Sequence, residues 1–242
     1  MVSKIDTQWF GSSLGSYLLS RELVYFDRAV ADVFGFYAVQ VGLPTIAYLR
    51  NSRIPQRVRC GLEPEALVRA DAMFLPFESQ SIDLVVLPHV LEFSSNPHQV
   101  LREAERVLRP EGQVVISGFN SASLWRLRQL TPFVSKSGAP WDAHFIGLLR
   151  LRDWLRVLGF ELNGGKFGCY VPPFASQVWL ERFAFMDPAG ARWWPVLGGV
   201  YVVRAVKRVH GVRMVTPAWR QERARRRALA AIPQRSHKSH HE

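Results

Sequence analysis

The chain has few of the features that mark secreted, metal-binding or membrane-spanning proteins. Only two of its 242 residues are cysteines, Cys60 and Cys169, so we expect neither a disulfide framework nor a metal site. Their scarcity favours a reducing, cytoplasmic location. The N-terminal segment MVSKIDTQWF has no continuous apolar core and no small-residue cleavage site, which argues against a signal peptide. The longest uncharged run, which contains Phe34 to Leu49, is too short to span a bilayer comfortably.

Acidic residues are scarce at one end of the chain. Residues 201–242 contain 11 Lys and Arg against 2 Asp and Glu, a net charge of +9, whereas residues 1–200 contain 20 against 18, a net charge of +2. The two parts add up to the total of +11. A basic tail at 211–242 therefore follows a nearly neutral body. Its Arg220 to Arg227 segment is open to two interpretations, phosphate contacts with a nucleic acid or a solvated basic helix.

The remainder predicts one α/β domain at 34–210, preceded by a helical segment at 1–33. Hydrophobic residues make up 48% of the chain, enough for a substantial core. We expect strands at 36–41, 57–60, 66–70, 82–87, 113–117, 160–162 and 200–206, the last two antiparallel. Helices are expected within 7–34 and at 45–49, 97–108, 121–130 and 148–158, with a loop at 131–141. An aromatic-rich insert, residues 170–194, either packs on the sheet or forms a lid over an apolar substrate.

The most informative stretch is residues 69–120. Asp71 ends one apolar run, Leu75-Pro76-Phe77 form a turn, and the buried strand 82–87 leads to a helix that ends at Arg106-Val107-Leu108-Arg109-Pro110-Glu111-Gly112. A further strand follows. Strands that alternate with a helix in this way predict a parallel sheet with a ligand crevice at the carboxyl ends of its strands.

This pattern resembles the class I S-adenosylmethionine-dependent methyltransferases, in particular their small-molecule type 11 group. The match covers about 50 residues and includes Asp83 and Val90-Leu91-Glu92-Phe93. It is also similar to an uncharacterised bacterial branch that keeps Leu-Pro-Phe and VISGFN. The resemblance implies a doubly wound, mostly parallel seven-stranded sheet and a bound S-adenosylmethionine. Asp83 itself, inside a strand, is expected to be structural and to pair with a nearby donor.

Glycine is missing where this family has most of it. The glycine-rich loop after the first strand reads Gln40-Val41-Gly42-Leu43-Pro44-Thr45-Ile46, and only Gly42 remains. Pro44 fixes φ and lacks an N–H, and Ile46 adds branched bulk. Glu63 is the nearest candidate for the acid that accepts the ribose hydroxyls, although only eight positions separate it from Asp71.

The resemblance assigns further site residues. Asp71 would accept a hydrogen bond from the adenine amino group, the alternative being a turn acid. Ala72, Met73, Leu87 and Pro88 would line the cofactor. His89, at the methyl-transfer face, is a candidate general base because an imidazole titrates near neutral pH, the alternative being a structural histidine. Ser117-Gly118-Phe119-Asn120 either line the substrate pocket or form a turn.

Three functional hypotheses follow. The first is a methyltransferase that acts on an unidentified, small-molecule acceptor. The second is a catalytically inactive protein of the same fold that acts in binding through its basic tail or aromatic insert, and the altered loop favours it. The third, an RNA-binding module, has no aromatic-plus-basic strand motif to support it.

Overall fold

The computed structural model describes residues 7–130, 141 and 143–208. Its helices and strands all belong to one compact unit, Met1–Val209. The predicted basic tail at 211–242 and nearly all of the predicted loop at 131–141 lie outside the described residues.

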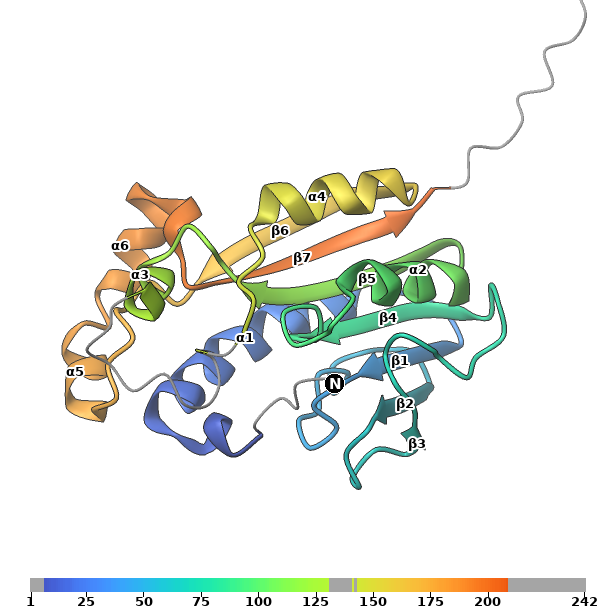
Figure 1. The fold of residues 1–242 in the computed structure, drawn as a ribbon, viewed down its shortest axis with the longest axis horizontal. Coiled ribbons are helices and arrows are strands. Elements are labelled where there is room, and N and C mark those ends of the chain that lie inside the picture. The colour runs from blue at the N-terminus through green and yellow to red at the C-terminus, as the bar shows by residue number, and fades with distance from the viewer. Residues whose placement is uncertain (1–6, 131–140, 142, 209–242) are drawn as a thin grey trace, which may run out of the picture. The chain divides into compact units, whose positions relative to one another are not determined.

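The core of this unit is a seven-stranded sheet (Figure 1). Its strand order is β3-β2-β1-β4-β5-β7-β6. The first five strands in this order are parallel to one another, whereas β7 is antiparallel to both β5 and β6. The expected doubly wound, mostly parallel sheet is therefore confirmed. The strands are β1 (Tyr37–Val41), β2 (Gln56–Gly61), β3 (Val68–Arg69), β4 (Ile82–Pro88), β5 (Leu108–Phe119), β6 (Phe160–Gly168) and β7 (Val200–Lys207).

Helices cover both faces of the sheet (Figure 1). One face packs against α1, and the other packs against α2 and α4. Helices α5 and α6 form the insert between β6 and β7. The helices are η1 (Thr7–Gly11), α1 (Ser13–Ala31), α2 (Pro97–Val107), α3 (Leu124–Leu130), α4 (Leu148–Val157), α5 (Gln177–Arg182), α6 (Met186–Trp193) and η2 (Pro195–Leu197).

Strand β4 shows why the sequence folds this way. Leu84 and Val86 pack in the core under α1, whereas Val85 and Leu87 pack in the core under α2 and α4. Successive side chains of a strand point to opposite faces, so a strand covered on both sides must be apolar throughout. The next element, α2, begins where the Asn96 side chain accepts a hydrogen bond from the Gln99 N–H at 3.1 Å.

The prediction of a helix at Thr45–Leu49 was wrong. These residues form turns, because the buried Gln40 side chain bonds the backbone that a helix would use. Its amide Nε2 donates to the carbonyls of Leu43 at 2.9 Å and Ile46 at 2.8 Å, and its Oε1 accepts from the Tyr48 N–H at 3.1 Å. A side chain that satisfies both carbonyls and an N–H removes the need for helical hydrogen bonds.

The structural role expected for Asp83 agrees with its contacts. Its carboxylate accepts hydrogen bonds from the N–H groups of Phe36 at 2.7 Å and Tyr37 at 2.9 Å, and it pairs with Arg109 at 3.1 Å. It thereby joins the start of β1 to β4 and β5. We expect Asp83→Ala to lower the free energy of unfolding by about 1–3 kcal/mol in urea denaturation, because two N–H groups lose a charged acceptor.

The matched control is Asp153→Ala. Asp153 is exposed and lies 3.7 Å from Arg152. Its replacement should change the free energy of unfolding by less than about 0.5 kcal/mol. Equal losses in the two variants would contradict a bridging role for Asp83.

Candidate functional site

The predicted cofactor residues follow four neighbouring strands. Gly42 follows β1, Glu63 follows β2, Asp71 follows β3, and Pro88 ends β4. These strands are adjacent and parallel, in the order β3-β2-β1-β4. The fold therefore brings these four residues to the carboxyl edge of the sheet, where doubly wound proteins bind their ligands.

The loop after β1 is closed by its own residues. Gly42 adopts a left-handed φ of 78°, and its N–H donates to the Cys60 carbonyl of β2 at 2.7 Å. Leu43, with φ of 46°, is fully buried. The Gln40 amide also donates to the Gly42 carbonyl, at 3.2 Å. The loop that is glycine-rich in the resembling family is thus fixed here by a side-chain amide, and the Gly42 N–H is already bonded.

Glu63 has an unsatisfied acceptor. Its Oε2 is buried and has no hydrogen-bond donor within the described residues. A carboxylate oxygen in that state gains stability when a ligand hydroxyl donates to it. The same carboxylate, after the larger effect of burial, helps to raise the pKa of the Cys60 thiol to about 11. Glu63 therefore fits the role of a ribose acceptor.

Asp71 shapes the turn that follows β3. Its Oδ1 accepts from the Met73 N–H at 2.9 Å, and its carbonyl accepts from the Phe74 N–H at 3.0 Å. This is the geometry of an Asx turn. Ala72 and Met73 lie in the same half-buried turn, and the Met73 sulfur lies 3.7 Å from the Ser95 hydroxyl. The adenine-binding role of Asp71 stays a prediction.

His89 lies immediately after β4 and is fully buried. Its Nδ1 lies 2.6 Å from Glu92 Oε1, and its Nε2 lies 3.2 Å from Glu22 Oε1. The second Glu22 oxygen accepts from the Tyr48 hydroxyl at 3.1 Å. Glu92 Oε1 also accepts from the Phe119 N–H, at 3.1 Å. We call Glu22, His89 and Glu92 the buried triad.

The buried triad favours a protonated imidazole. Burial alone would lower the pKa of His89, but the carboxylates of Glu22 and Glu92 outweigh burial and raise the pKa to about 10. The His89 ring is also covered by Phe119, at a centroid distance of 4.4 Å, and by Phe10 at 6.2 Å. A general base needs a free basic nitrogen within reach of the substrate. This geometry supports the structural alternative for His89, and its role as a base stays a prediction.

Sequence reasoning missed two members of the buried triad. Glu92 was recognised only as part of the Val-Leu-Glu-Phe segment, and Glu22 was not singled out. Glu22 occupies an inward position of α1, beside the buried Leu18 and Phe26. A glutamate in the apolar stripe of an amphipathic helix needs a partner, and that was the available signal.

The last strand residues at this edge are also buried. Leu87 and Pro88 both point into the protein, and Pro88 pairs with Ser117 of β5. Phe119 packs on Phe145 and Trp125, and Asn120 bonds the segment before β7. Asn120 Oδ1 also accepts from the Ala122 N–H, as expected for a turn. Beyond forming the turn, the Asn120 amide therefore anchors the segment before β7 to the end of β5.

The aromatic insert divides into packed and exposed parts. Phe174 and Phe183 pack against the core beneath α1, at a centroid distance of 5.4 Å from each other. Phe185, Trp193 and Trp194 are instead exposed. Phe174 and Phe183 therefore agree with the expectation that the insert packs on the sheet. The exposure of Phe185, Trp193 and Trp194 is explained neither by packing nor by a lid.

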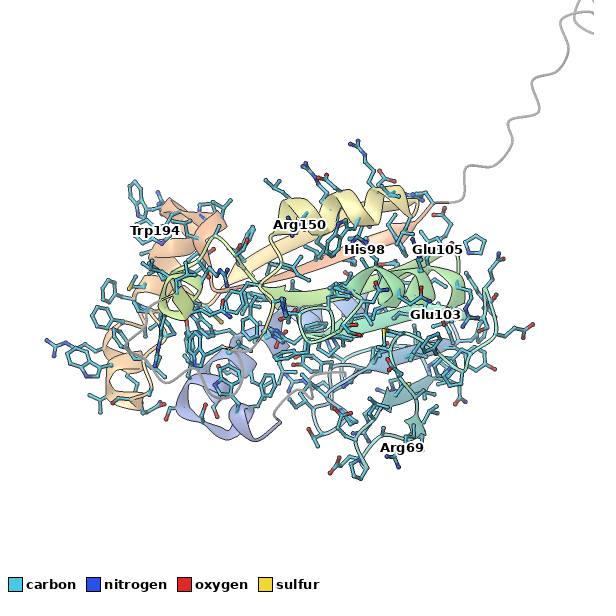
Figure 2. The ribbon with its side chains drawn as sticks, in the orientation of Figure 1. Arg69, His98, Glu103, Glu105, Arg150 and Trp194 are labelled. Atoms are coloured by element: carbon cyan, nitrogen blue, oxygen red, sulfur yellow. The ribbon has the colours of Figure 1, made fainter. Side chains whose placement is uncertain are left out.

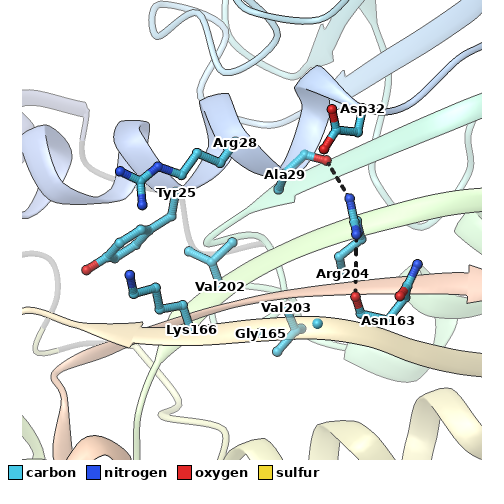
Figure 3. Close-up of a pocket in the computed structure, with 11 residues that line it drawn as sticks. Tyr25, Arg28, Ala29, Asp32, Asn163, Gly165, Lys166, Val202, Val203 and Arg204 are labelled. Carbon is cyan, nitrogen blue, oxygen red and sulfur yellow. Dashed lines mark hydrogen bonds between the residues drawn. The ribbon is translucent and has the colours of Figure 1, made fainter. Parts of the chain in front are cut away.

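A basic groove lies on the α1 face of the sheet, away from the strand ends (Figure 3). It has a volume of about 240 Å³. The Lys166 amine lies 5.1 Å from the centre of the Tyr25 ring, and Arg204 donates to the Ala29 carbonyl at 3.4 Å. Since Arg204 pairs with Val115 in the middle of β5, this groove is separate from the predicted cofactor edge.

No helix among the described residues is long and apolar enough to cross a membrane. In the same part of the chain, no three His, Cys, Asp or Glu side chains are arranged to hold a metal ion.

Solved methyltransferases share this fold. An S-adenosylmethionine-dependent methyltransferase from Thermotoga maritima superposes with a TM-score of 0.56 and 19% identity, over 83% of this chain and 94% of the other. One from Mesorhizobium loti gives a TM-score of 0.52 and 14% identity, over 76% and 96%. Together with the strand order and the ligand edge, these likenesses define a protein of the class I methyltransferase fold.

Part of the sequence matches a known family model. Residues 28–116 match the model described as a methyltransferase domain. Uncharacterized protein YafS from Escherichia coli is 44% identical over 101 residues, 41% of this chain and 42% of YafS. Malonyl-(acyl-carrier protein) O-methyltransferase from Laribacter hongkongensis is 34% identical over 113 residues, 46% of this chain and 37% of that enzyme. Both matches cover less than half of the relative.

Proposed function

We propose that the protein is an S-adenosylmethionine-dependent methyltransferase that acts on a small-molecule acceptor in the cytoplasm. The observation that carries this proposal is Glu63, whose buried Oε2 lacks a donor at the ligand edge of a methyltransferase fold. The scarcity of cysteine, with both thiols free and buried, supports the location.

S-adenosylmethionine, when bound, supplies an activated methyl group. The protein would hold it with Glu63 at the ribose hydroxyls and Asp71 at the adenine amino group. The turn at Ala72 and Met73 and the end of β4 at Leu87 and Pro88 would give shape to the site. Methyl transfer needs mainly alignment of donor and acceptor. A rigid edge made of strand ends supplies that alignment.

A second candidate function is binding without catalysis. The closed Gln40 loop favours it, because the Gly42 N–H and the loop carbonyls already have partners. Such a protein would act through its basic tail or through the aromatic insert.

Calorimetric titration with S-adenosylmethionine and S-adenosylhomocysteine separates the two. We expect binding in the micromolar range, and Glu63→Ala should weaken it about tenfold or more because a charged acceptor of two hydroxyls is lost. Asp71→Ala should also weaken binding.

The control is Glu65→Ala. Glu65 is an exposed carboxylate two residues beyond Glu63, so its removal causes the same change in net charge but leaves the buried Glu63 oxygen in place. It should bind both ligands as the wild type does. Absence of wild-type binding up to about millimolar ligand would favour the non-catalytic function.

A further inference from the structure

Five consecutive exposed apolar residues begin at the last residue of α6 and continue through η2 toward β7. They are Trp193-Trp194-Pro195-Val196-Leu197, which we call the apolar ridge. Trp193 is 73% exposed, Trp194 40%, Val196 58% and Leu197 44%. Single exposed apolar side chains are ordinary, whereas groups of them mark binding surfaces for a protein, a membrane or a ligand.

The backbone of the apolar ridge is held firmly from below. The Tyr170 hydroxyl donates to the Pro195 carbonyl at 2.7 Å. The buried Asn120 amide donates to the carbonyls of Val196 at 2.8 Å and Gly198 at 2.9 Å. Exposure of the ridge therefore does not result from fraying. A surface that is ordered before it meets its partner loses little conformational entropy on binding.

The charged side chain next to the apolar ridge is positive. Arg192 lies 5.9 Å from the Trp193 ring centre. No acidic residue occurs between Pro188 and Gly199. The acidic residue closest to the ridge in the sequence, Asp187, forms an ion pair with Arg21 at 3.0 Å and accepts from the Tyr17 hydroxyl. An approaching surface would meet tryptophan, aliphatic groups and guanidinium together.

This combination matches the chemistry of a lipid bilayer surface. Tryptophan favours the boundary between headgroups and acyl chains, aliphatic side chains enter the acyl layer, and arginine pairs with anionic headgroups. Figure 2 shows Trp194 at the end of α6, on the periphery of the molecule. We propose that the apolar ridge docks the protein onto the surface of an anionic phospholipid bilayer.

Docking would also orient the sheet. The apolar ridge leads directly into β7, whose first residue, Val200, pairs with Phe119 at the carboxyl end of β5. Pro88, at the end of β4, pairs with Ser117 two residues earlier. The bilayer would therefore lie beside the edge of the sheet at which parallel strands end. This arrangement does not depend on the proposed methyl transfer.

The test is flotation of the full chain with vesicles of phosphatidylcholine and phosphatidylglycerol at a 3:1 ratio. Trp193→Ser combined with Trp194→Ser should lower the partition coefficient at least tenfold. The matched control is Leu149→Ser with Val157→Ser, which removes two apolar side chains exposed on α4, and it should bind as the wild type does. Brominated acyl chains should quench the tryptophan fluorescence of the wild type more than that of the double Trp variant.

Three results would overturn the proposal. The first is failure of the wild type to float with anionic vesicles. The second is equal flotation of the double Trp variant and the wild type, which would assign membrane binding to the basic tail. The third is absence of vesicle binding together with self-association, seen by sedimentation velocity, that the double Trp variant loses. That result would assign the apolar ridge to a second copy of the chain. Circular dichroism of both variants establishes that they are folded.

Discussion

Replacing His89 by alanine is expected to lower the free energy of unfolding by about 3–5 kcal/mol, because two buried carboxylates then lose the cation between them. Glu22 and Glu92 both lie within 3.2 Å of the His89 ring, and all three side chains are buried. Urea denaturation at pH 7 measures the loss. His98→Ala is the control, since His98 is an exposed histidine that contacts Trp154, and it should cost less than about 1 kcal/mol.

The stabilisation by His89 should depend on pH in a defined direction. Its pKa is about 10 in the folded protein and about 6.5 when unfolded, so the folded state holds the proton more tightly. The contribution is fully present below pH 6.5 and is lost as pH rises toward 10. The stability difference between the wild type and His89→Ala should shrink over that interval. A difference that stays constant would contradict a charged His89.

A double-variant cycle tests the ion pairs directly. Glu22→Gln removes one of the two carboxylates, so it should partly restore stability when it is combined with His89→Ala. The combined loss should be smaller than the sum of the two single losses by about 1–3 kcal/mol. Strict additivity would indicate that Glu22 and His89 act independently.

Replacing Gln40 by alanine is expected to lower the free energy of unfolding by about 2–4 kcal/mol and to open the loop after β1. The Gln40 amide donates to three carbonyls and accepts from the Tyr48 N–H, all of which would lose a partner. Faster trypsin cleavage at Arg50 and Arg53 would report the opening, and urea denaturation the stability.

Two further variants sharpen this test. Gln40→Glu has nearly the same shape but, when ionised, places a carboxylate against three carbonyl oxygens, so its loss should exceed that of Gln40→Ala. Gln56→Ala removes an exposed glutamine from β2 and should change stability by less than about 0.5 kcal/mol. If Gln40→Glu were as stable as the wild type, the amide would not be what closes the loop.

The sequence was sufficient where structure depends on local patterns. Strand β4 is apolar throughout because it is covered on both faces, and α2 has a recognisable cap at Asn96. The antiparallel pairing of β6 and β7 was also predicted correctly, although β6 continues to Gly168, well beyond Leu162. Its glycines and Lys166 obscured the strand pattern, because exposed edge strands need no apolar alternation.

The candidate site was harder to predict because its contacts are distant in the sequence. Glu22 and His89 are 67 positions apart, and no local sequence pattern around either residue predicts their contact. Gln40 was recognised as the first residue of the altered loop. Its bonds to that loop depend on turns at 45–49, where the sequence had predicted a helix. Exposure of the apolar ridge was equally hidden, since Trp and Leu in a sequence favour burial.

The insertion of β7 between β5 and β6 has a consequence for synthesis and truncation. Strand β6 is synthesised before β7, yet among the described residues it pairs with β7 alone. The edge of β5 that faces away from β4 also has no partner strand until β7 is made. Until Lys207 has left the ribosome, two strands expose unsatisfied backbone edges, and such edges promote aggregation. A nascent chain that stalls shortly before Val200 would thus present a split sheet, and the final strand acts as the closing element of the fold.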